Sequence, residues 1–536
     1  MNMNLLCLRW ALSAWAFSLG SAVAAPVGVP LANASVTAPT WTSMRVVARS
    51  GVPDVQCVSM PRAASSASAV EQDPREIPDD DEVQAALQAA GVSPMPSKTG
   101  VPALAAGLGR ARPGEPYRVA IWGDSHLAAG FFTNELVKIL KLEPDQVRAG
   151  FLPASMNRPG VRLPLRKSCV SPHWRYESAH AHLASATAPG PGLVSLVSAQ
   201  AGASLAWDVR NAAGMAEARQ LRVLYQQSAQ PIQLAVSVDG APEIELQLTG
   251  NPGPGVLELT ADSPLSVVQV RLVAGEFRLQ GLALPVHHTT ALQMDVFGFP
   301  GATVAGWKQA STDALSAWFA QTPYQLVMMA FGTNEGNVKP FDPAVYQATL
   351  REAVNNMRTV FPQAACVLIA PGDRGVLVRR SEKWKPASAS PRAAVEKKTV
   401  KKSGKSGAPS AASHSGSKKG KTKGQSHHAS AASGAEKPAP AESTPGPARN
   451  LLQYTRIHEE IGQIQSAVAQ QYGCSVWSML QAMGGQGGAY RWSRQSPPLM
   501  ARDLIHFTVL GYQQLAQQFA QDMGWDAAQI LPLSPP

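Results

Sequence analysis

Three residues far apart in the chain have the types that nucleophilic ester chemistry requires. Ser125 lies in the sequence Gly-Asp-Ser-His, between an apolar segment that predicts a strand and a periodic segment that predicts a helix. A serine hydroxyl becomes a nucleophile only when a base takes its proton. Near the C-terminus, His506 could take that proton while Asp503, three residues earlier, fixes the tautomer of the imidazole. The pattern predicts a Ser-His-Asp triad.

Two loop motifs between these positions offer hydrogen-bond donors for the negative oxygen of a tetrahedral intermediate. Gly301, in Gly-Phe-Pro-Gly-Ala-Thr, offers a backbone N–H in a tight turn, and Asn334, in Gly-Thr-Asn-Glu-Gly, offers a side-chain amide. Each motif is common by itself, and their joint occurrence at predicted strand ends is the specific signal. We expect Gly301, Asn334 and the backbone N–H of Ser125 to form an oxyanion hole.

The residues on either side of the nucleophile have alternative uses. His126 could be the base, but at the start of a helix its side chain is expected to point away from Ser125, so His506 is preferred. Asp124 resembles a metal ligand, yet no cluster of carboxylates or histidines accompanies it. No CxxC or Cys/His spacing typical of a zinc site is present. We therefore expect no metal and no cofactor.

Alternating strand and helix patterns surround these motifs. Short apolar segments that predict strands lie at 117–121, 326–331, 366–370 and 474–477. Segments with apolar residues at helical spacing lie at 131–142, 343–360, 451–471 and 508–523. This alternation is typical of an α/β fold with a parallel sheet covered by helices on both faces. Ligands in such folds bind at the carboxyl ends of the strands, where the motifs fall.

Residues 175–288 follow a different pattern. Five short segments of mostly alternating hydrophobicity lie between 221 and 272, separated by Gly, Pro, Asn and Asp. Many short strands without helical segments indicate a β-sandwich or jelly roll. We expect this part of the chain to be a β domain inserted into the α/β domain.

The motifs resemble the sequence blocks of the SGNH hydrolases, also called GDSL-type esterases. The matching residues are Gly123–His126, Gly301 within its turn, Gly332–Glu335 and Asp503–His506. His replaces the usual Leu in the first block and Glu replaces the more usual Asp in the third, beside the functional positions. The resemblance implies a flavodoxin-like three-layer α/β/α fold, with Ser125 as nucleophile, His506 as general base and Asp503 as the carboxylate that orients it.

The resemblance and the local composition together divide the chain into segments. Three parts of one SGNH domain are expected at 117–174, 289–380 and 449–536, with the β-sandwich at 175–288 inserted between the first two. The other segments are a signal peptide at 1–24, a partly disordered N-terminal extension at 25–116 and a disordered basic loop at 381–448. Within the extension, an acidic start predicts a short helix near 79–90.

The N-terminus predicts export. A short apolar core at 10–19 precedes Ala22–Ala24, a small-residue cleavage site, and the alternative is an N-terminal anchor. No later segment is apolar enough to predict a transmembrane helix. We expect a periplasmic or cell-envelope location, where disulfides can form. Cys366 and Cys474 each open a strand-like segment, so they could form a disulfide or remain buried thiols. The pairing of Cys57 and Cys169 is left open.

The net charge of +10 comes from a single segment. Residues 381–440 hold 12 Lys, 1 Arg and 3 Glu, while the rest of the chain has 34 basic and 34 acidic side chains. This distribution argues against a fold with a basic face for nucleic acid. The segment is either a solvated spacer or a tether to anionic polymers of the cell wall.

The order of the domains favours one substrate. An exported SGNH domain with a β insert between its first two blocks resembles the bacterial peptidoglycan O-acetylesterases, whose insert resembles a carbohydrate-binding module. The resemblance implies removal of acetyl groups from the C6 hydroxyl of muramoyl residues. A lipase or thioesterase, or a polysaccharide O-acetyltransferase, would use the same triad. A non-enzymatic glycan-binding wall protein would carry a vestigial one.

Aromatic side chains are candidates for stacking on the sugar rings of such a polymer. The residues considered are Trp174, Trp207 and Trp307. The alternative is that each packs in a core, as large aromatic residues usually do.

Overall fold

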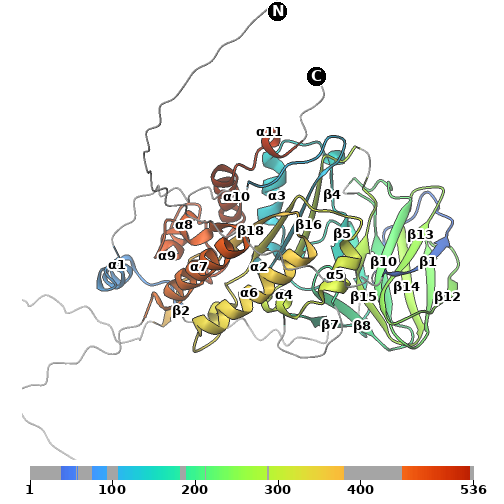
Figure 1. Ribbon diagram of the computed structural model, residues 1–536, viewed down its shortest axis with the longest axis horizontal. Coiled ribbons are helices and arrows are strands. Elements are labelled where there is room, and N and C mark those ends of the chain that lie inside the picture. The colour runs from blue at the N-terminus through green and yellow to red at the C-terminus, as the bar shows by residue number, and fades with distance from the viewer. Residues whose placement is uncertain are drawn as a thin grey trace, which may run out of the picture.

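The computed structural model describes residues 38–55, 57, 75–92, 107–180, 189–211, 213–286, 289–379 and 450–531. They form an α/β domain and, beside it, a β domain (Figure 1). The expected signal peptide at 1–24 and basic loop at 381–448 lie outside the described residues. Among the helices of the described residues, none is long and apolar enough to cross a membrane.

The α/β domain is built on a six-stranded sheet whose neighbouring strands are all parallel. In spatial order the strands are β20 (Ser475–Ser478), β18 (Ala365–Ala370), β17 (Leu326–Ala330), β3 (Tyr117–Gly123), β16 (Leu292–Gly298) and β4 (Val147–Arg148). Apart from the short β4 at the edge, the strands follow the flavodoxin-like order, with the first strand of the chain in the interior of the sheet. This confirms the expected fold class.

Helices cover both faces of this sheet. One face packs against α3 (Phe131–Ile139) and α10 (Val509–Met523), and the other against α4 (Ala305–Gln309), α5 (Thr312–Phe319), α6 (Pro343–Val360) and α7 (Gln453–Tyr472). Successive residues of a strand point to opposite faces. Val119 and Ile121 of β3 therefore lie in the first core, while Ala120 and Trp122 lie in the second. Because both faces are buried, the strands are mostly apolar, as expected for a parallel sheet, with Gln293 and Asp295 of β16 as buried polar exceptions.

Shorter elements complete the α/β domain. They are α2 (Ser125–Ala128), η1 (Pro144–Gln146), η2 (Glu335–Asn337), α8 (Met479–Ala482), α9 (Gly488–Ser493), α11 (Ala527–Ile530) and the strand pair β2 (Arg75–Glu76) and β19 (Val378–Arg379). The short helix expected near 79–90 is α1 (Asp80–Ala89), and Asp79 and Glu82 form its capping box. Its buried Val83 and Leu87 pack into the core beneath α3 and α10.

The β domain consists of two sheets that share one apolar core. The first contains β1 (Thr40–Arg45), β13 (Gly253–Thr260), β10 (Gln220–Gln227), β15 (Phe277–Ala283), β8 (Val194–Ser198) and β7 (Arg175–Ser178), with β5 (Phe151–Pro153) paired to β15. The second contains β12 (Ile244–Leu248), β11 (Ile232–Val238), β14 (Val267–Ala274), β9 (Ser204–Asp208) and β6 (Lys167–Val170). All pairs are antiparallel except β1 with β13. This arrangement is a β-sandwich.

The β domain takes in more of the chain than the 175–288 that we expected. Strands β1, β5 and β6 come from outside that range, and β1 and β6 lie at sheet edges. Each is short, and its place in a sheet depends on partners far along the chain, such as Thr40 opposite Gly255. The N-terminal extension, expected to be partly disordered, is therefore ordered over 38–55, where Asp54 also pairs with Arg166 and Arg210.

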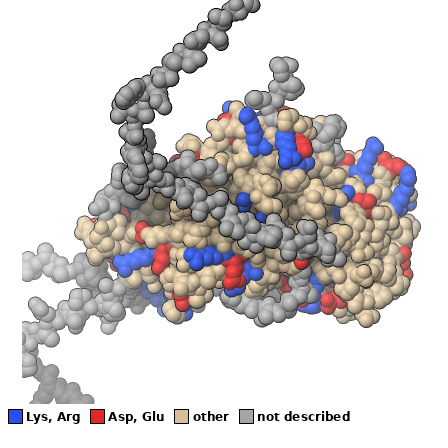
Figure 2. All heavy atoms as spheres, viewed as in Figure 1, with Lys and Arg blue, Asp and Glu red and all other residues tan. Residues whose placement is uncertain are grey.

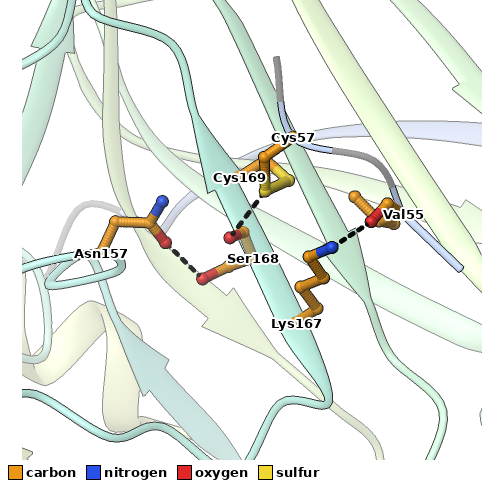
Figure 3. Close-up of a disulfide and its surroundings, with 6 residues drawn as sticks. All are labelled: Val55, Cys57, Asn157, Lys167, Ser168 and Cys169. Atoms are coloured by element: carbon orange, nitrogen blue, oxygen red, sulfur yellow. Dashed lines mark hydrogen bonds between the residues drawn. A yellow bond between two sulfur atoms is a disulfide. The ribbon is translucent and has the colours of Figure 1, made fainter. Parts of the chain in front are cut away.

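Two disulfides hold distant segments together. Cys57 is joined to Cys169 of β6, so that the N-terminal segment is attached to the second sheet, and the nearby ammonium of Lys167 donates to the carbonyl of Val55 (Figure 3). Cys366 is joined to Cys474, which are opposite each other at the start of β18 and β20. The second disulfide is one of the two outcomes that we expected for these cysteines, and the first was not predicted.

Charges of both signs are mixed on the surface. On the face shown in Figure 2, Lys and Arg side chains lie next to Asp and Glu rather than in a patch of one sign. The equal numbers of basic and acidic side chains outside 381–440 are consistent with this mixture of charges.

We expect the double substitution of Cys57 and Cys169 by Ser to lower the free energy of unfolding of the β domain by about 2–4 kcal/mol, because the cross-link restricts the unfolded chain. Denaturant unfolding would measure it. Double substitution of Cys366 and Cys474 by Ser is the matched control. In hydrogen exchange, the first variant should lose protection in β6 and the control should not; equal loss in both would contradict this prediction.

Candidate active site

Ser125 lies at the carboxyl end of β3, where the chain turns into α2. β16 and β17 lie on opposite sides of β3, and ligands of such folds bind at the point where the connections diverge. Asp124 caps α2, since its carboxylate accepts from the N–H of His126 at 2.9 Å. Only glycine fits at Gly298, because a Cβ there would lie 2.6 Å from the backbone nitrogen of Ala128. The nucleophile is thereby held on a tightly packed turn.

The turn that precedes α10 brings a base and a carboxylate to Ser125. Nε2 of His506 lies 2.9 Å from Oγ of Ser125, and Nδ1 of His506 lies 2.7 Å from Oδ2 of Asp503. Oδ1 of Asp503 accepts from the N–H groups of Ile505 and His506, both at 2.9 Å. Because Nδ1 donates to the carboxylate, Nε2 of the neutral imidazole is the acceptor, and the Ser125 hydroxyl donates to it.

The pairing of His506 with Asp503 controls the charge of both. The hydrogen bond to Asp503 raises the pKa of His506 above its usual value, although burial acts in the opposite direction. Burial alone would raise the pKa of Asp503, but hydrogen bonds from His506 and from backbone N–H groups lower it to about 2. Asp503 is therefore ionised at neutral pH and favours the proton-bearing form of His506.

The expected oxyanion donors lie on loops at the same edge of the sheet. Nδ2 of Asn334, after β17, donates to the carbonyl of Ala302 at 2.9 Å and lies 3.5 Å from Oδ2 of Asp124. Gly301 has a φ of 84°, in the left-handed region that favours glycine. Within the described residues, the backbone N–H groups of Ser125 and Gly301 donate to no other group. They remain available to an oxygen atom of a substrate.

Glu335 holds the two oxyanion loops together. Its Oε1 accepts from the N–H of Val304 at 2.7 Å, and its Oε2 accepts from the N–H of Gly332 at 3.0 Å. The side chain is buried, and burial raises its pKa to about 7 against the effect of these N–H groups. The sequence showed Glu335 only as a departure from the family pattern. The role of Glu335 depends on the distance between two loops in the folded chain, which a local sequence pattern does not predict.

The residues beside the nucleophile have structural partners. Nδ1 of His126 lies 3.1 Å from the hydroxyl of Tyr512, and its ring packs on the ring of His506. Burial lowers the pKa of His126 to about 3, so it stays neutral. Burial raises the pKa of Asp124 to about 6. In the part of the chain that the structure describes, no group of three or more His, Cys, Asp or Glu could hold a metal ion.

Two of the three tryptophans proposed to bind sugar are buried completely. Trp207 lies in the core of the β domain, where its Nε1 donates to the sulfur of Met156 at 3.1 Å, and Trp307 packs edge-on against Trp122. Neither can touch a polymer, so this prediction is wrong for both. Trp174 is partly exposed, and its Nε1 donates to the carbonyl of Ser204 at 3.1 Å. Trp174 therefore remains a candidate for stacking.

His180, which the sequence did not single out, reaches the site from the loop after β7. Its Nδ1 donates to the carbonyl of Thr303 at 2.7 Å, and its ring stacks on Phe299. A residue that follows strand β7 of the β domain therefore helps to hold the loop that carries Gly301. No sequence motif marks His180, because its partner is more than a hundred residues away.

Comparisons with known proteins find similarity at the level of solved structures. No family model and no curated protein matches the chain. A solved peptidoglycan O-acetylesterase is 17% identical, with 83% of this chain and 94% of that chain covered and a TM-score of 0.49. A family two carbohydrate esterase from Cellvibrio japonicus is 12% identical, with 67% of this chain and 98% of that chain covered and a TM-score of 0.21.

A third solved structure, a putative GDSL-like lipase from Parabacteroides merdae, is 11% identical, with 44% of this chain and 74% of that chain covered and a TM-score of 0.24. At such identities and TM-scores the similarities assign neither substrate nor site. The sequence blocks and the strand order of this chain resemble those of the SGNH hydrolases.

We expect Asp503→Asn to lower the pKa of His506, because the substitution removes the negative charge that stabilises the imidazolium. NMR titration of the histidine ring protons would measure the shift. His180 is the internal control, since burial lowers its pKa to about 4 against the effect of its hydrogen bond to Thr303, and Asp503 does not act on it. An unchanged or higher pKa of His506 in the variant would show that Asp503 does not govern its charge.

Proposed function

We propose that the chain is an exported serine esterase of the SGNH type that removes O-acetyl groups from a cell-wall polysaccharide, with peptidoglycan as the preferred substrate. The observation that carries the proposal is the continuous hydrogen-bonded chain from Ser125 through His506 to Asp503. The Ser125 hydroxyl is partly exposed, and we assign the backbone N–H groups of Ser125 and Gly301 and the amide of Asn334 as the donors to the oxyanion. This combination suits acyl transfer.

In the first step, Oγ of Ser125 attacks the acetyl carbonyl while Nε2 of His506 takes the hydroxyl proton. The carbonyl oxygen becomes negative and is stabilised by the N–H groups of Ser125 and Gly301 and the amide of Asn334. The imidazolium then gives its proton to the ester oxygen of the sugar as the bond between that oxygen and the acetyl carbon breaks. Asp503 stabilises the transient positive charge on His506 and holds its ring in place. The products are a free sugar hydroxyl and an acetylated Ser125.

In the second step, water takes the place of the sugar hydroxyl. His506 removes a proton from the water as its oxygen attacks the acetyl carbonyl. The bond between the acetyl carbon and Oγ of Ser125 then breaks, His506 returns the proton to Oγ, and acetate is the second product. A polysaccharide O-acetyltransferase would deliver the acetyl group to another sugar instead, and a lipase or thioesterase would accept long acyl chains.

The choice of polymer rests on the arrangement of the chain. The β-sandwich is packed beside the α/β domain and contributes His180, through which it contacts the loop of Gly301. A glycan bound by the β domain would therefore lie on a part of the molecule that is joined directly to the site. Trp174 is the aromatic residue that could take part in that binding.

Ser125→Ala should lower kcat/KM for acetyl esters by about a thousandfold or more, because only the oxyanion donors and substrate binding remain. The measurement is acetate release from O-acetylated peptidoglycan and hydrolysis of p-nitrophenyl esters of increasing chain length. Ser43→Ala, on the exposed face of β1, is the matched control. Equal activity in Ser125→Ala would refute the triad, and activity only on long acyl chains would refute the acetylesterase.

Asn334→Ala should lower kcat by about a hundredfold to a thousandfold with little change in KM, because the amide acts on charge that develops in the transition state. Asn355→Ala, an exposed residue of α6, is the matched control and should leave both constants unchanged. A rise in KM with an unchanged kcat would instead mean that Asn334 binds the ground state of the substrate.

A further inference from the structure

Two cationic side chains lie against one aromatic ring near the triad. The guanidinium carbon of Arg374, in the loop after β18, lies 4.0 Å from the ring centroid of Tyr454. Nζ of Lys339, in the loop after η2, lies 5.0 Å from the same centroid. Arg374 and Tyr454 are partly exposed and Lys339 is exposed, so solvent reaches this cluster.

The backbone connects Arg374 to the loops of the triad and the oxyanion hole. The N–H of Gly375, the next residue, donates at 3.0 Å to the carbonyl of Leu504, which lies inside the Asp503–His506 turn. The Arg374 guanidinium donates to the side chain of Asn337. The N–H of Asn337 in turn donates to the carbonyl of Asn334 at 3.1 Å. Arg374 therefore lies between the loop of the base and the loop of the oxyanion amide.

Arg374 has no salt-bridge partner among the described residues, although the carboxylate of Asp503 acts on its charge from a greater distance. Among the described residues, no carboxylate lies within ion-pair distance of Arg374 or Lys339, and Nε of Arg374 is buried without a hydrogen-bond partner. By contrast, the well-buried guanidiniums of Arg210 and Arg278 both pair with carboxylates. A buried guanidinium N–H without an acceptor costs free energy, and an anion from outside would supply the acceptor.

The position of this charge also affects the reaction. Arg374 lowers the pKa of His506, against the stronger opposite effect of Asp503. A nearby cation disfavours the imidazolium that forms during catalysis. A substrate anion bound at Arg374 would remove that disadvantage when the correct substrate is present.

We propose that Arg374 and Lys339, which both contact the ring of Tyr454, bind a carboxylate of the substrate and so direct the esterase toward O-acetylated acidic sugars. This inference rests on the proposed esterase function and deepens it. A guanidinium binds a carboxylate through paired N–H groups, and the ammonium adds a second charge. The carboxylate belongs either to the sugar or to a peptide attached to it.

The test compares 6-O-acetyl-N-acetylmuramic acid with 6-O-acetyl-N-acetylglucosamine, which lacks the lactyl ether that carries the carboxylate. We expect the wild-type protein to favour the muramic acid ester at least tenfold in kcat/KM. Arg374→Gln should bring the ratio of the two values close to one, and Lys339→Gln should reduce it in part. Arg351→Gln, on the exposed face of α6, is the matched control and should leave the ratio unchanged.

A third ester, with a dipeptide on the lactyl group, separates the two sources of the carboxylate. If this ester is still preferred over the N-acetylglucosamine ester and the preference depends on Arg374, the carboxylate that binds is that of the peptide. If the preference is lost, the carboxylate that binds is that of the lactyl group of the sugar. An unchanged ratio in both variants would overturn the proposal. An equal fall on both simple esters in Arg374→Gln would also overturn it, because Arg374 would then only position the His506 turn.

Binding without turnover separates this inference from the proposed function. In the Ser125→Ala background, N-acetylmuramic acid should bind at least tenfold more weakly after Arg374→Gln, as measured by NMR titration, and N-acetylglucosamine should be unaffected. If the wild-type protein hydrolyses no acetyl ester, the esterase proposal fails while this measurement still tests the subsite. Lys339→Gln changes an exposed side chain, so it keeps the test valid if Arg374→Gln does not fold.

Discussion

The hydrogen bond between Ser125 and His506 joins residues that are 381 positions apart, and the parallel sheet makes it possible. Because all its strands run in one direction, their carboxyl ends meet at one edge. The nucleophile after β3, Gly301 after β16 and Asn334 after β17 must then lie close together. The turn before α10 returns to the same edge with the base. The geometry of the whole site therefore depends on the loops at this edge keeping fixed positions relative to one another.

Buried carboxylates hold that edge and the neighbouring domain in place. Asp124 caps the turn of the nucleophile, and Glu335 accepts backbone N–H groups from both oxyanion loops. Asp295 in β16 accepts the N–H groups of Gly150 and Phe151 at 2.6 and 2.9 Å, where the chain leaves for the β domain. Burying a carboxylate is costly unless it is hydrogen bonded, and each of these is. Loop geometry and domain attachment therefore depend on the same type of interaction.

The contrast between Arg374 and these carboxylates is informative. Inside the fold, the buried carboxyl groups of Asp124, Asp295 and Glu335 accept hydrogen bonds, and Arg210 and Arg278 of the β domain have carboxylate partners. Near the triad, Arg374 and Lys339 have none among the described residues. Stability does not require that arrangement, whereas binding an anionic substrate would. The local charge at the site is thus separate from the net charge of the chain, which resides in 381–440.

The alternation of strands and helices, the presence of a β domain and the four motifs can all be predicted from the sequence. Each of them depends on the types and spacing of residues within a short segment, and that spacing reflects local backbone geometry. Only the tertiary structure decided that Trp207 and Trp307 are buried, that β1, β5 and β6 join the β domain, and that Cys57 pairs with Cys169. It also placed Glu335 between the two oxyanion loops, and Arg374 between the loop of Asn334 and the turn of His506. These outcomes depend on which residues meet across a hundred or more positions, and no local pattern of residue types carries that information.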